Sequence, residues 1–460
     1  MLALTGLAIG AEKPVQVYIL SGQSNMVGIG QVGPMGASRM NTFVSAEKNA
    51  EQGAILSIYE GAFDPEADYE QKEAKETHAV RLGYWPHTTF PSIEGPSVSI
   101  ARGFIRIDRA GEYSFRTTGN SIMEVDGKVM HRSVEGEEEV NVRTRLEPGT
   151  HPIRVTFLGS ARSNMSHSIW DVPGTLTTLV HQQGKFPYLA GPDGGWVSRD
   201  DVWYRGVVTA GANKWLAPGC GANASQIGPE LGFGHMVGNF HDEPVLIIKA
   251  SQGNRSLAWD FLPPGSERFE VGDMVYAGYK DPKSSWPKGE TPEEGGWYAG
   301  KQYDECFGAA KEVLAKFDES FPHWAGRGYE IAGFGWFQGH KDTGSEVHAN
   351  RYESNLVNLI RALRKEFDAP DAPFVVAVGC GNEGREGTGL IIADAQLAVC
   401  GSTGKYPEFK GNVKSVDTRD YFPTAEESPR DQGYHYHQNA GAYMQIGEAM
   451  GKAMVELLKQ

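Results

Sequence analysis

Ser24 has a nucleophilic side chain at a point of the sequence where a nucleophile would be exposed. It lies in the segment 21–26, which follows an apolar run at 15–20 and includes Gly22. The run is short, β-branched and aromatic, which predicts a buried strand, and Gly22 permits a sharp turn at its end. A serine at this corner would present its hydroxyl at the carboxyl edge of a sheet, where α/β folds bind their ligands. Backbone N–H groups at the start of the next helix can stabilise an oxyanion there. The same residues also fit a plain polar turn, because such short motifs recur by chance.

A nucleophilic serine requires a general base, a group that orients the base, and oxyanion donors. The segment 431–440 contains His435 and His437 just before the last predicted helix. A histidine on such a loop can be directed at the carboxyl edge of the sheet. If the segment is extended, the two side chains point to opposite sides, so that only one faces Ser24.

Two further polar segments follow predicted strands. The segment 251–257 follows the strand at 245–250, and the segment 338–342 follows the strand at 331–337. A glycine N–H from the first segment and the side-chain amide of Gln338 from the second would complete an oxyanion hole. Each segment alone also fits an ordinary strand-to-loop turn, but their joint presence favours a catalytic site.

The elements that would position these segments alternate between strands and helices. Patterning predicts strands at 15–20, 245–250, 329–337 and 374–378, and helices at 303–317, 351–367 and 439–458. This order indicates an α/β fold whose parallel sheet is covered by helices on both faces. The stretch 84–180 differs, because short segments with period-two alternation are separated there by Asp-Gly and Pro-Gly turns. That pattern predicts an inserted β-sandwich.

Composition limits the class of protein. With 460 residues the chain exceeds one ordinary domain. Its formal net charge of −15 argues against nucleic acid and anionic membrane surfaces as partners. The apolar, small-residue segment 1–11 resembles the end of a secretory signal peptide, so we expect a secreted or periplasmic protein. No other segment predicts a membrane span. The four cysteines lack zinc-site spacing, which leaves disulfides and free thiols both open.

Taken together, these segments resemble the SGNH-hydrolase superfamily and, within it, the sialate O-acetylesterase-like carbohydrate esterases. The matching segments are 22–26, 227–234, 253–257, 336–339 and the histidine-rich segment with 446–451. The resemblance implies a three-layer α/β/α (flavodoxin-like) SGNH fold with a parallel sheet, in two parts at 14–83 and 181–460. It also implies removal of acetyl or similar acyl groups from an acetylated oligo- or polysaccharide, without metal or cofactor.

The resemblance assigns roles to particular residues. Ser24 is the implied nucleophile, and the oxyanion hole is formed by its N–H, Gly253 and the side chain of Gln338. The implied base is a histidine near the C terminus, for which His435 matches the related sequences better than His437. We expect three neighbouring polar residues to bind the substrate: Gln23, Asn25 and Asn254.

The chain departs from the family pattern at two places. A glutamate is usual at the position of His340, and an aspartate is usual three residues before the catalytic histidine. Here Asp431 stands four residues before His435, and we take it as the orienting acid. Three other aspartates remain as alternatives for the acid: Asp342, Asp417 and Asp420. A Ser–His dyad, in which a backbone carbonyl orients the imidazole, is a further alternative.

The inserted stretch 84–180 resembles the protective-antigen-type lectin-like domain, through the segments 111–115, 125–129 and 146–155. Calcium-dependent members carry paired aspartates where this chain has 118–121, so calcium-dependent sugar binding is not expected. The inserted domain would then serve as a lid that shapes the substrate site or as a spacer.

Our principal hypothesis is an exported carbohydrate O-acylesterase, for which we expect acetyl to be the acyl group. A non-catalytic glycan-binding protein on a hydrolase scaffold is the first alternative, because the usual acid is missing. An esterase for non-sugar esters is the second. The sugar, the acyl position and the oligomeric state are not determined by the sequence.

Overall fold

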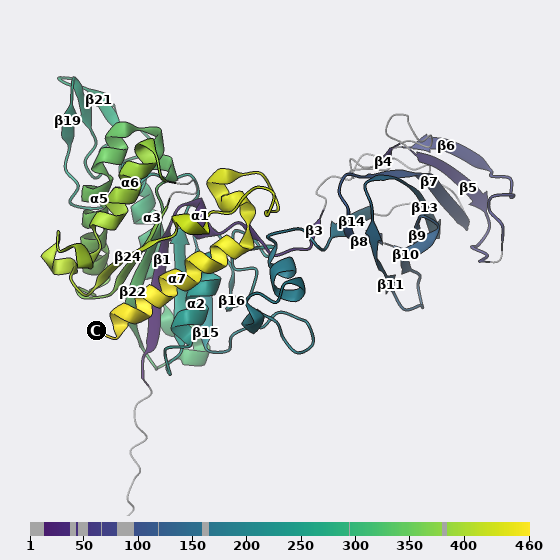
Figure 1. Ribbon diagram of the computed structural model, residues 1–460, viewed down its shortest axis with the longest axis horizontal. Coiled ribbons are helices and arrows are strands. Elements are labelled where there is room, and N and C mark those ends of the chain that lie inside the picture. Colours follow the sequence, from purple (N-terminus) through teal and green to yellow (C-terminus); the bar gives the residue numbers. More distant parts are fainter. Residues whose placement is uncertain are drawn as a thin grey trace, which may run out of the picture. The chain divides into compact units, whose positions relative to one another are not determined.

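The computed structural model describes residues 13–36, 43–44, 54–65, 67–80, 96–117, 119–158, 165–293, 295–379 and 384–460. The chain divides into two compact units (Figure 1). The first contains the chain up to Val32 and from Pro173 to Gln460, and the second contains Gly33–Val172. The proposed leader at 1–11, the loop residue Thr118 and Cys380 lie outside the described residues.

The first unit is built on a seven-stranded sheet with the order β16-β15-β18-β1-β22-β23-β24. Neighbouring strands are parallel except at the edge, where β16 is antiparallel to β15. The protein is therefore an α/β protein with a mostly parallel sheet. The strands are β1 (Val15–Gly22), β15 (Val202–Val207), β16 (Asn213–Trp215), β18 (Val245–Ser251), β22 (Tyr329–Phe337), β23 (Phe374–Val378) and β24 (Val413–Asp417).

Helices cover both faces of this sheet, and β1 is therefore buried on both sides. Its odd-numbered residues Val15, Val17 and Ile19 pack in one core with α3, α5 and α6. Tyr18 and Leu20 pack in a second core with α2 and α7. The main helices are α1 (Ser24–Val27), α2 (Pro229–Gly238), α3 (Lys301–Ala315), α4 (Phe317–Ser320), α5 (Glu346–Glu366), α6 (Gly387–Ala398) and α7 (Ala440–Leu458).

Smaller elements lie at the ends of the sheet strands. A two-stranded ribbon pairs β2 (Gly30–Gln31) with β17 (Gln226–Ile227), and a three-stranded sheet consists of β19 (Phe269–Val271), β20 (Met274–Tyr276) and β21 (Ser285–Pro287). The short helical turns are η1 (Thr178–Gln182), η2 (Pro187–Leu189), η3 (Pro322–Trp324), η4 (His340–Gly344), η5 (Gly401–Thr403), η6 (Pro407–Phe409), η7 (Arg419–Tyr421) and η8 (Gly433–Gln438).

The second unit consists of two antiparallel sheets. The order of the larger is β11-β10-β9-β13-β7-β5-β6, with β4 paired to β7, and that of the smaller is β12-β8-β14-β3. Side chains from both sheets form one core, which includes Ile105, Phe115 and Val155. The strands are β3 (Met35–Gly36), β4 (Phe43–Val44), β5 (Ala54–Glu60), β6 (Glu76–Val80), β7 (Ser97–Ile107), β8 (Gly111–Thr117), β9 (Ser121–Val125), β10 (Lys128–Ser133), β11 (Val140–Asn141), β12 (Arg143–Leu146), β13 (Gly149–Leu158) and β14 (Met165–Ile169).

The limits of this second unit differ from the expected 84–180. The unit begins at Gly33, because β5 and β6 precede residue 84 in the chain and yet belong to the sheet of β7. It ends at Val172, because η1 packs through Leu179 and Val180 in the core of the first unit.

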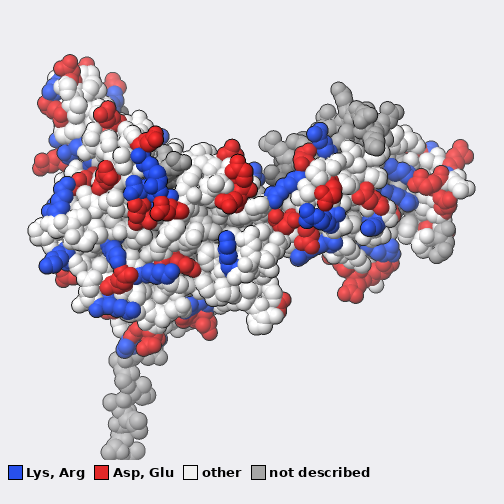
Figure 2. All heavy atoms as spheres, in the orientation of Figure 1, with Lys and Arg blue, Asp and Glu red and all other residues white. Residues whose placement is uncertain are grey.

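The surface charges, the helices and the cysteines bear on three earlier expectations. Lys and Arg side chains are interspersed with Asp and Glu on the face shown in Figure 2. None of the helices in the described part of the chain is long and apolar enough to cross a membrane. The three described cysteines, Cys220, Cys306 and Cys400, are free thiols.

Candidate active site

Ser24 occupies the predicted corner between β1 and α1, and its side chain is half-buried. The turn requires Gly22, whose φ is +150° and whose Cβ would lie 2.1 Å from the backbone oxygen of Phe337. No other residue type lets β1 approach β22 so closely at this point. The serine N–H belongs to the first turn of α1, where backbone N–H groups have no acceptor within the helix.

His435 meets this serine. Its Nε2 lies 3.0 Å from Ser24 Oγ, within the range of a hydrogen bond between a nucleophile and its base. Desolvation and, to a smaller extent, repulsion by His340 together lower the pKa of His435 to about 4. The imidazole is therefore neutral at pH 7 and able to accept the serine proton.

The turn that carries His435 is held in an unusual backbone conformation. The expected extended segment is instead the helical turn η8, in which Tyr436, His437 and Gln438 have φ of 50°, 50° and 59°. Such left-handed values are costly for residues other than glycine. Asn439 ends the turn by capping α7, since its Oδ1 accepts the N–H of Gly441 at 2.9 Å.

Asn25 connects Ser24 to this turn. Its Nδ2 donates to the backbone oxygen of Tyr434 at 3.1 Å, and its Oδ1 accepts from the Tyr443 hydroxyl at 2.7 Å. The residue is buried. We predicted Asn25 as a substrate ligand, but its amide is occupied inside the protein, where it aligns the nucleophile with its base.

Gly253 lies beside the nucleophile as expected. A Cβ placed on it would be 3.7 Å from Ser24 Cβ, so its backbone faces the site. Asn254 follows in a left-handed conformation, with φ of 55°, and is exposed. It remains a predicted substrate contact.

Gln338 does not have the free amide that an oxyanion donor needs. Its Nε2 donates to Asp342 Oδ2 at 2.7 Å and to the Arg255 backbone oxygen at 2.9 Å. A primary amide has two N–H donors, and both are used here. Gln338 therefore positions the loop after β18 instead of contacting the oxyanion. Gln23, a predicted substrate ligand, is also buried, and its Oε1 accepts from Lys341 N–H at 3.2 Å.

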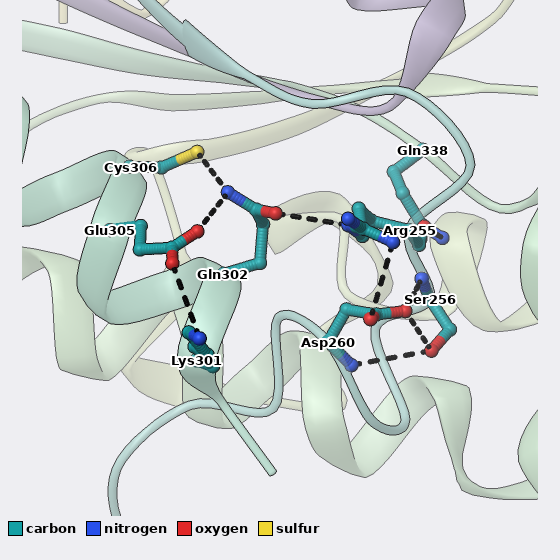
Figure 3. Close-up of polar contacts among 8 residues, drawn as sticks. All are labelled: Arg255, Ser256, Asp260, Lys301, Gln302, Glu305, Cys306 and Gln338. Carbon is teal, nitrogen blue, oxygen red and sulfur yellow. Dashed lines mark hydrogen bonds and ion pairs between the residues drawn. The ribbon is translucent and has the colours of Figure 1, made fainter. Parts of the chain in front are cut away.

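The loop after β18 is held in place from two sides. Arg255 Nε donates to Gln302 Oε1 at 3.0 Å, and Ser256 N–H donates to Asp260 Oδ2 at 2.8 Å (Figure 3). Asp342 accepts the N–H groups of Leu257 at 2.8 Å and Ala258 at 2.9 Å. Burial raises the pKa of Asp342 to about 6. These contacts fix the backbone that presents Gly253 to Ser24.

Comparison with known proteins decides the family. The family model described as "Carbohydrate esterase, sialic acid-specific acetylesterase" matches residues 212–456. The chain belongs to this family of carbohydrate esterases. It is thus a hydrolytic esterase, as the sequence motifs predicted.

Solved structures with detectable similarity are distant from this esterase. A protein from Arabidopsis thaliana is 16% identical, covers 56% of this chain and 82% of its own, and has a TM-score of 0.35. A carbohydrate acetylesterase from Xanthomonas citri is 12% identical, with coverages of 77% and 70% and a TM-score of 0.36. A carbohydrate esterase family 2 enzyme with a carbohydrate-binding domain, from Corynascus (Myceliophthora fergusii), is 12% identical, with coverages of 79% and 94% and a TM-score of 0.29. No curated protein matches the chain.

The expected orienting acid of the esterase lies elsewhere. Asp431 is exposed, and its Oδ1 lies 3.4 Å from His437 Nδ1 rather than at His435. That nitrogen accepts the N–H of Gln432 at 3.1 Å, so His437 braces the turn. The left-handed run begins at Tyr436, directly after His435, and includes His437, whose ring therefore lies at Asp431 and Gln432 and not at Ser24.

The alternative acids have other partners too. Asp417 pairs with Arg419, Asp420 pairs with Arg385, and Asp342 holds the loop after β18. His435 Nδ1 is buried and has no hydrogen-bond partner among the described residues. At the position of the family glutamate, His340 stacks against Tyr434 with ring centroids 5.7 Å apart.

One buried ion pair of the esterase was not predicted. Lys249 Nζ lies 2.9 Å from Glu230 Oε2 and donates to the Val27 backbone oxygen at 2.7 Å, at the end of α1. Both side chains are fully buried. A lysine inside the apolar strand 245–250 was the signal that could have revealed it. No group of three or more potential metal ligands occurs among the described residues.

Proposed function

We propose that this esterase removes acetyl groups from sugar hydroxyls by a Ser–His mechanism on an SGNH-type fold. The observation that carries the proposal is the 3.0 Å contact between Ser24 Oγ and the neutral His435 Nε2. Family membership supplies the reaction class, ester hydrolysis on carbohydrate. We propose in addition that Ser24 is the nucleophile, that His435 is its base and that acetyl is the acyl group removed.

In the first half-reaction, His435 Nε2 accepts the proton of Ser24 Oγ while the oxygen bonds to the acetyl carbonyl carbon. The backbone N–H groups of Ser24 and Gly253 stabilise the resulting oxyanion. His435 then protonates the sugar oxygen, the C–O bond breaks, and the sugar leaves with acetyl-Ser24 remaining.

In the second half-reaction, water loses a proton to His435 and attacks the acetyl carbonyl, and the serine oxygen leaves with that proton. Acetate is released and the free enzyme is restored. With no carboxylate on His435 Nδ1 in the described part of the chain, we describe the centre as a dyad. A dyad depends on the neutral imidazole that burial provides.

The test is acetate release from a panel of acetylated oligosaccharides by wild type, Ser24→Ala, His435→Ala and His437→Ala. We expect the first two variants to lose a factor on the order of 10³ or more, and equally, because members of one catalytic unit are non-additive. His437→Ala should lose much less, since His437 contacts the turn and not the serine. A phosphonate serine probe should label wild type but not Ser24→Ala.

Retained hydrolysis in Ser24→Ala would refute the proposed nucleophile. A larger loss in His437→Ala than in His435→Ala would move the base to His437. We further propose export, from the apolar segment 1–11. Fractionation of expressing cells tests it, and retention of the protein inside the cell would refute it.

A further inference from the structure

A second polar feature adjoins the Ser24–His435 pair. A cleft of about 830 Å³ is lined by four glutamines, Gln31, Gln226, Gln432 and Gln438, and by Tyr434. Tyr434 directly precedes His435, and the two rings have centroids 4.4 Å apart. We call this feature the glutamine cleft. None of its four glutamines takes part in the mechanism derived above.

The four glutamines come from three separate elements of one compact unit. Gln31 of β2 and Gln226 of β17 are register partners in the two-stranded ribbon. Gln432 immediately precedes η8, and Gln438 is its last residue. All four are partly exposed. Residues so far apart in the sequence form one surface only because the ribbon lies against the histidine turn.

Three of the amides and the tyrosine form a chain of hydrogen bonds. Gln31 Nε2 donates to Gln438 Oε1 at 2.6 Å, and Gln438 Nε2 donates to Gln432 Oε1 at 2.5 Å. Gln432 Nε2 in turn donates to the Tyr434 hydroxyl at 2.5 Å. A primary amide has two N–H donors and two lone pairs on oxygen. Gln432 and Gln438 each therefore keep one donor and one acceptor that this chain does not use.

This arrangement matches the chemistry of a sugar ring. A sugar hydroxyl donates and accepts at the same time, and an amide offers a donor and an acceptor at a fixed spacing. Tyr434 is 45% exposed and adds an apolar ring with a polar tip, which suits the C–H face of a sugar.

The charges at the cleft favour an uncharged sugar. Arg430 and Asp431 are the charged residues of its lining, and they carry opposite signs. The remaining polar groups are neutral amides and a phenol. The charges of the two side chains cancel, so the lining carries no net positive charge that would favour an anionic sugar.

The backbone of η8 couples the cleft to the catalytic base. Gln438 and the two residues before it adopt the left-handed conformation, which persists only where surrounding contacts determine it. His437 provides such a contact, since its Nδ1 accepts the N–H of Gln432 at 3.1 Å. The same strained turn thus sets the positions of His435, Gln432 and Gln438. Strain retained at such a place is typical of a functional site.

We propose that the glutamine cleft is a subsite for an uncharged, hydroxyl-rich sugar residue of the acetylated glycan. The ester would lie at Ser24 and the sugar would extend past Tyr434 into the cleft. This inference rests on the proposed function for the position of the ester, but the binding itself does not depend on hydrolysis.

The first test compares two substrates in Gln226→Leu and Gln438→Leu. We expect the ratio of kcat/KM on an acetylated xylo-oligosaccharide to kcat/KM on 4-nitrophenyl acetate to fall about tenfold, as one or two hydrogen bonds to the sugar are lost. Gln226 lies on β17, outside η8 and outside the chain of amides, so it reports on the sugar even if Gln438→Leu disturbs the turn. Gln183→Leu, an exposed glutamine that does not line the cleft, is the control and should leave the ratio at the wild-type value.

The second test measures binding without catalysis. Calorimetric titration of Ser24→Ala with an unacetylated xylo-oligosaccharide should detect binding that the added Gln226→Leu change weakens about tenfold. An oligogalacturonide of equal length should bind more weakly. Tighter binding of the acidic sugar, or an unchanged ratio in both variants, would overturn the subsite. If wild type hydrolyses neither ester but binding still depends on Gln226, the subsite stands and the proposed esterase mechanism fails.

Discussion

The carboxylate of Asp342 accepts the backbone N–H of Leu257 at 2.8 Å, which joins the turn after β22 to the loop after β18. Its second oxygen accepts the N–H of Ala258 at 2.9 Å. Asp342 is fully buried. Two parallel strands on either side of β1 are thereby tied together at the edge where Ser24 lies.

Asp342→Asn should therefore damage the loop that presents Gly253. The new NH₂ group would face an N–H donor, and a buried donor left without an acceptor costs about 1–3 kcal/mol. We expect urea unfolding to show a free energy of unfolding that is lower by this amount. We also expect kcat to fall by a larger factor than KM changes. Asp318→Asn is a suitable control, because Asp318 accepts one backbone N–H from Gly326 on an exposed surface. Equal effects of both variants on kcat would contradict the positioning role.

The acid–base behaviour of His435 offers a direct measurement. Burial lowers its pKa to about 4, so the imidazole loses its proton as pH rises through about 4 and is neutral above. An NMR titration of its C2–H resonance, assigned by its loss in His435→Ala, should show that midpoint instead of the ordinary value near 6.5.

The same titration tests the missing acid. His340→Glu places a carboxylate at the family position, which should favour the imidazolium and raise the pKa of His435. His340→Gln, which adds no charge, is the control and should raise it less. A wild-type midpoint at or above 6.5 would instead indicate that an acid already contacts His435.

The buried Lys249–Glu230 pair should matter for stability. Lys249→Met leaves the Glu230 carboxylate in the core without a counter-charge and removes a donor from the Val27 oxygen. Breaking a buried pair in this way costs about 3–5 kcal/mol. We expect urea unfolding to show this loss in the free energy of unfolding. The control is Lys311→Met, which breaks the exposed pair of Lys311 with Glu366 and should change that free energy by about 0.5 kcal/mol or less.

The double variant Lys249→Met/Glu230→Gln should recover part of this loss, because the carboxylate that lacked a partner is then neutral. A double variant less stable than Lys249→Met would show that the charge of Glu230 is not the source of the cost.

The second unit should be removable. The two ends of the second unit lie close together, because Met35 of β3 pairs with Ile169 of β14. The flanking ends of the first unit also meet, because the backbone oxygen of Val32 accepts the N–H of Thr177 at 2.8 Å. Deleting 33–172 with a short Gly-Ser linker should leave a folded first unit with the circular dichroism of an α/β protein and activity on 4-nitrophenyl acetate. If the sandwich is lectin-like, activity on acetylated polymer should fall.

Deleting 84–180 provides the contrast. That deletion removes Thr177, which contacts Val32, and leaves β5 and β6 without β7. It should yield insoluble protein. Soluble, active protein from this deletion and not from the first would refute the limits of the unit.

Local patterning was sufficient for the elements of the catalytic edge. The strands at 329–337 and 374–378 have the predicted limits, and Ser24 stands at the predicted corner. Apolar runs and turn residues carry this information because burial on both faces and the close approach at Gly22 are local requirements. The related sequences also favoured His435 over His437 as the histidine that faces Ser24, and His435 is the one that lies beside it.

Only the tertiary structure decided what each polar side chain contacts. Asp431 reaches His437 because the chain enters a left-handed run of three residues directly after His435, and no periodicity reveals such a run. Gln338 lacks a free amide because Asp342 and Arg255 take both of its donors. The second unit starts at Gly33 because β5 pairs with β7, and the glutamine cleft exists because Gln31 pairs with Gln226. Pairings of this kind join distant residues, and their partners are selected by packing of the whole fold rather than by neighbouring sequence.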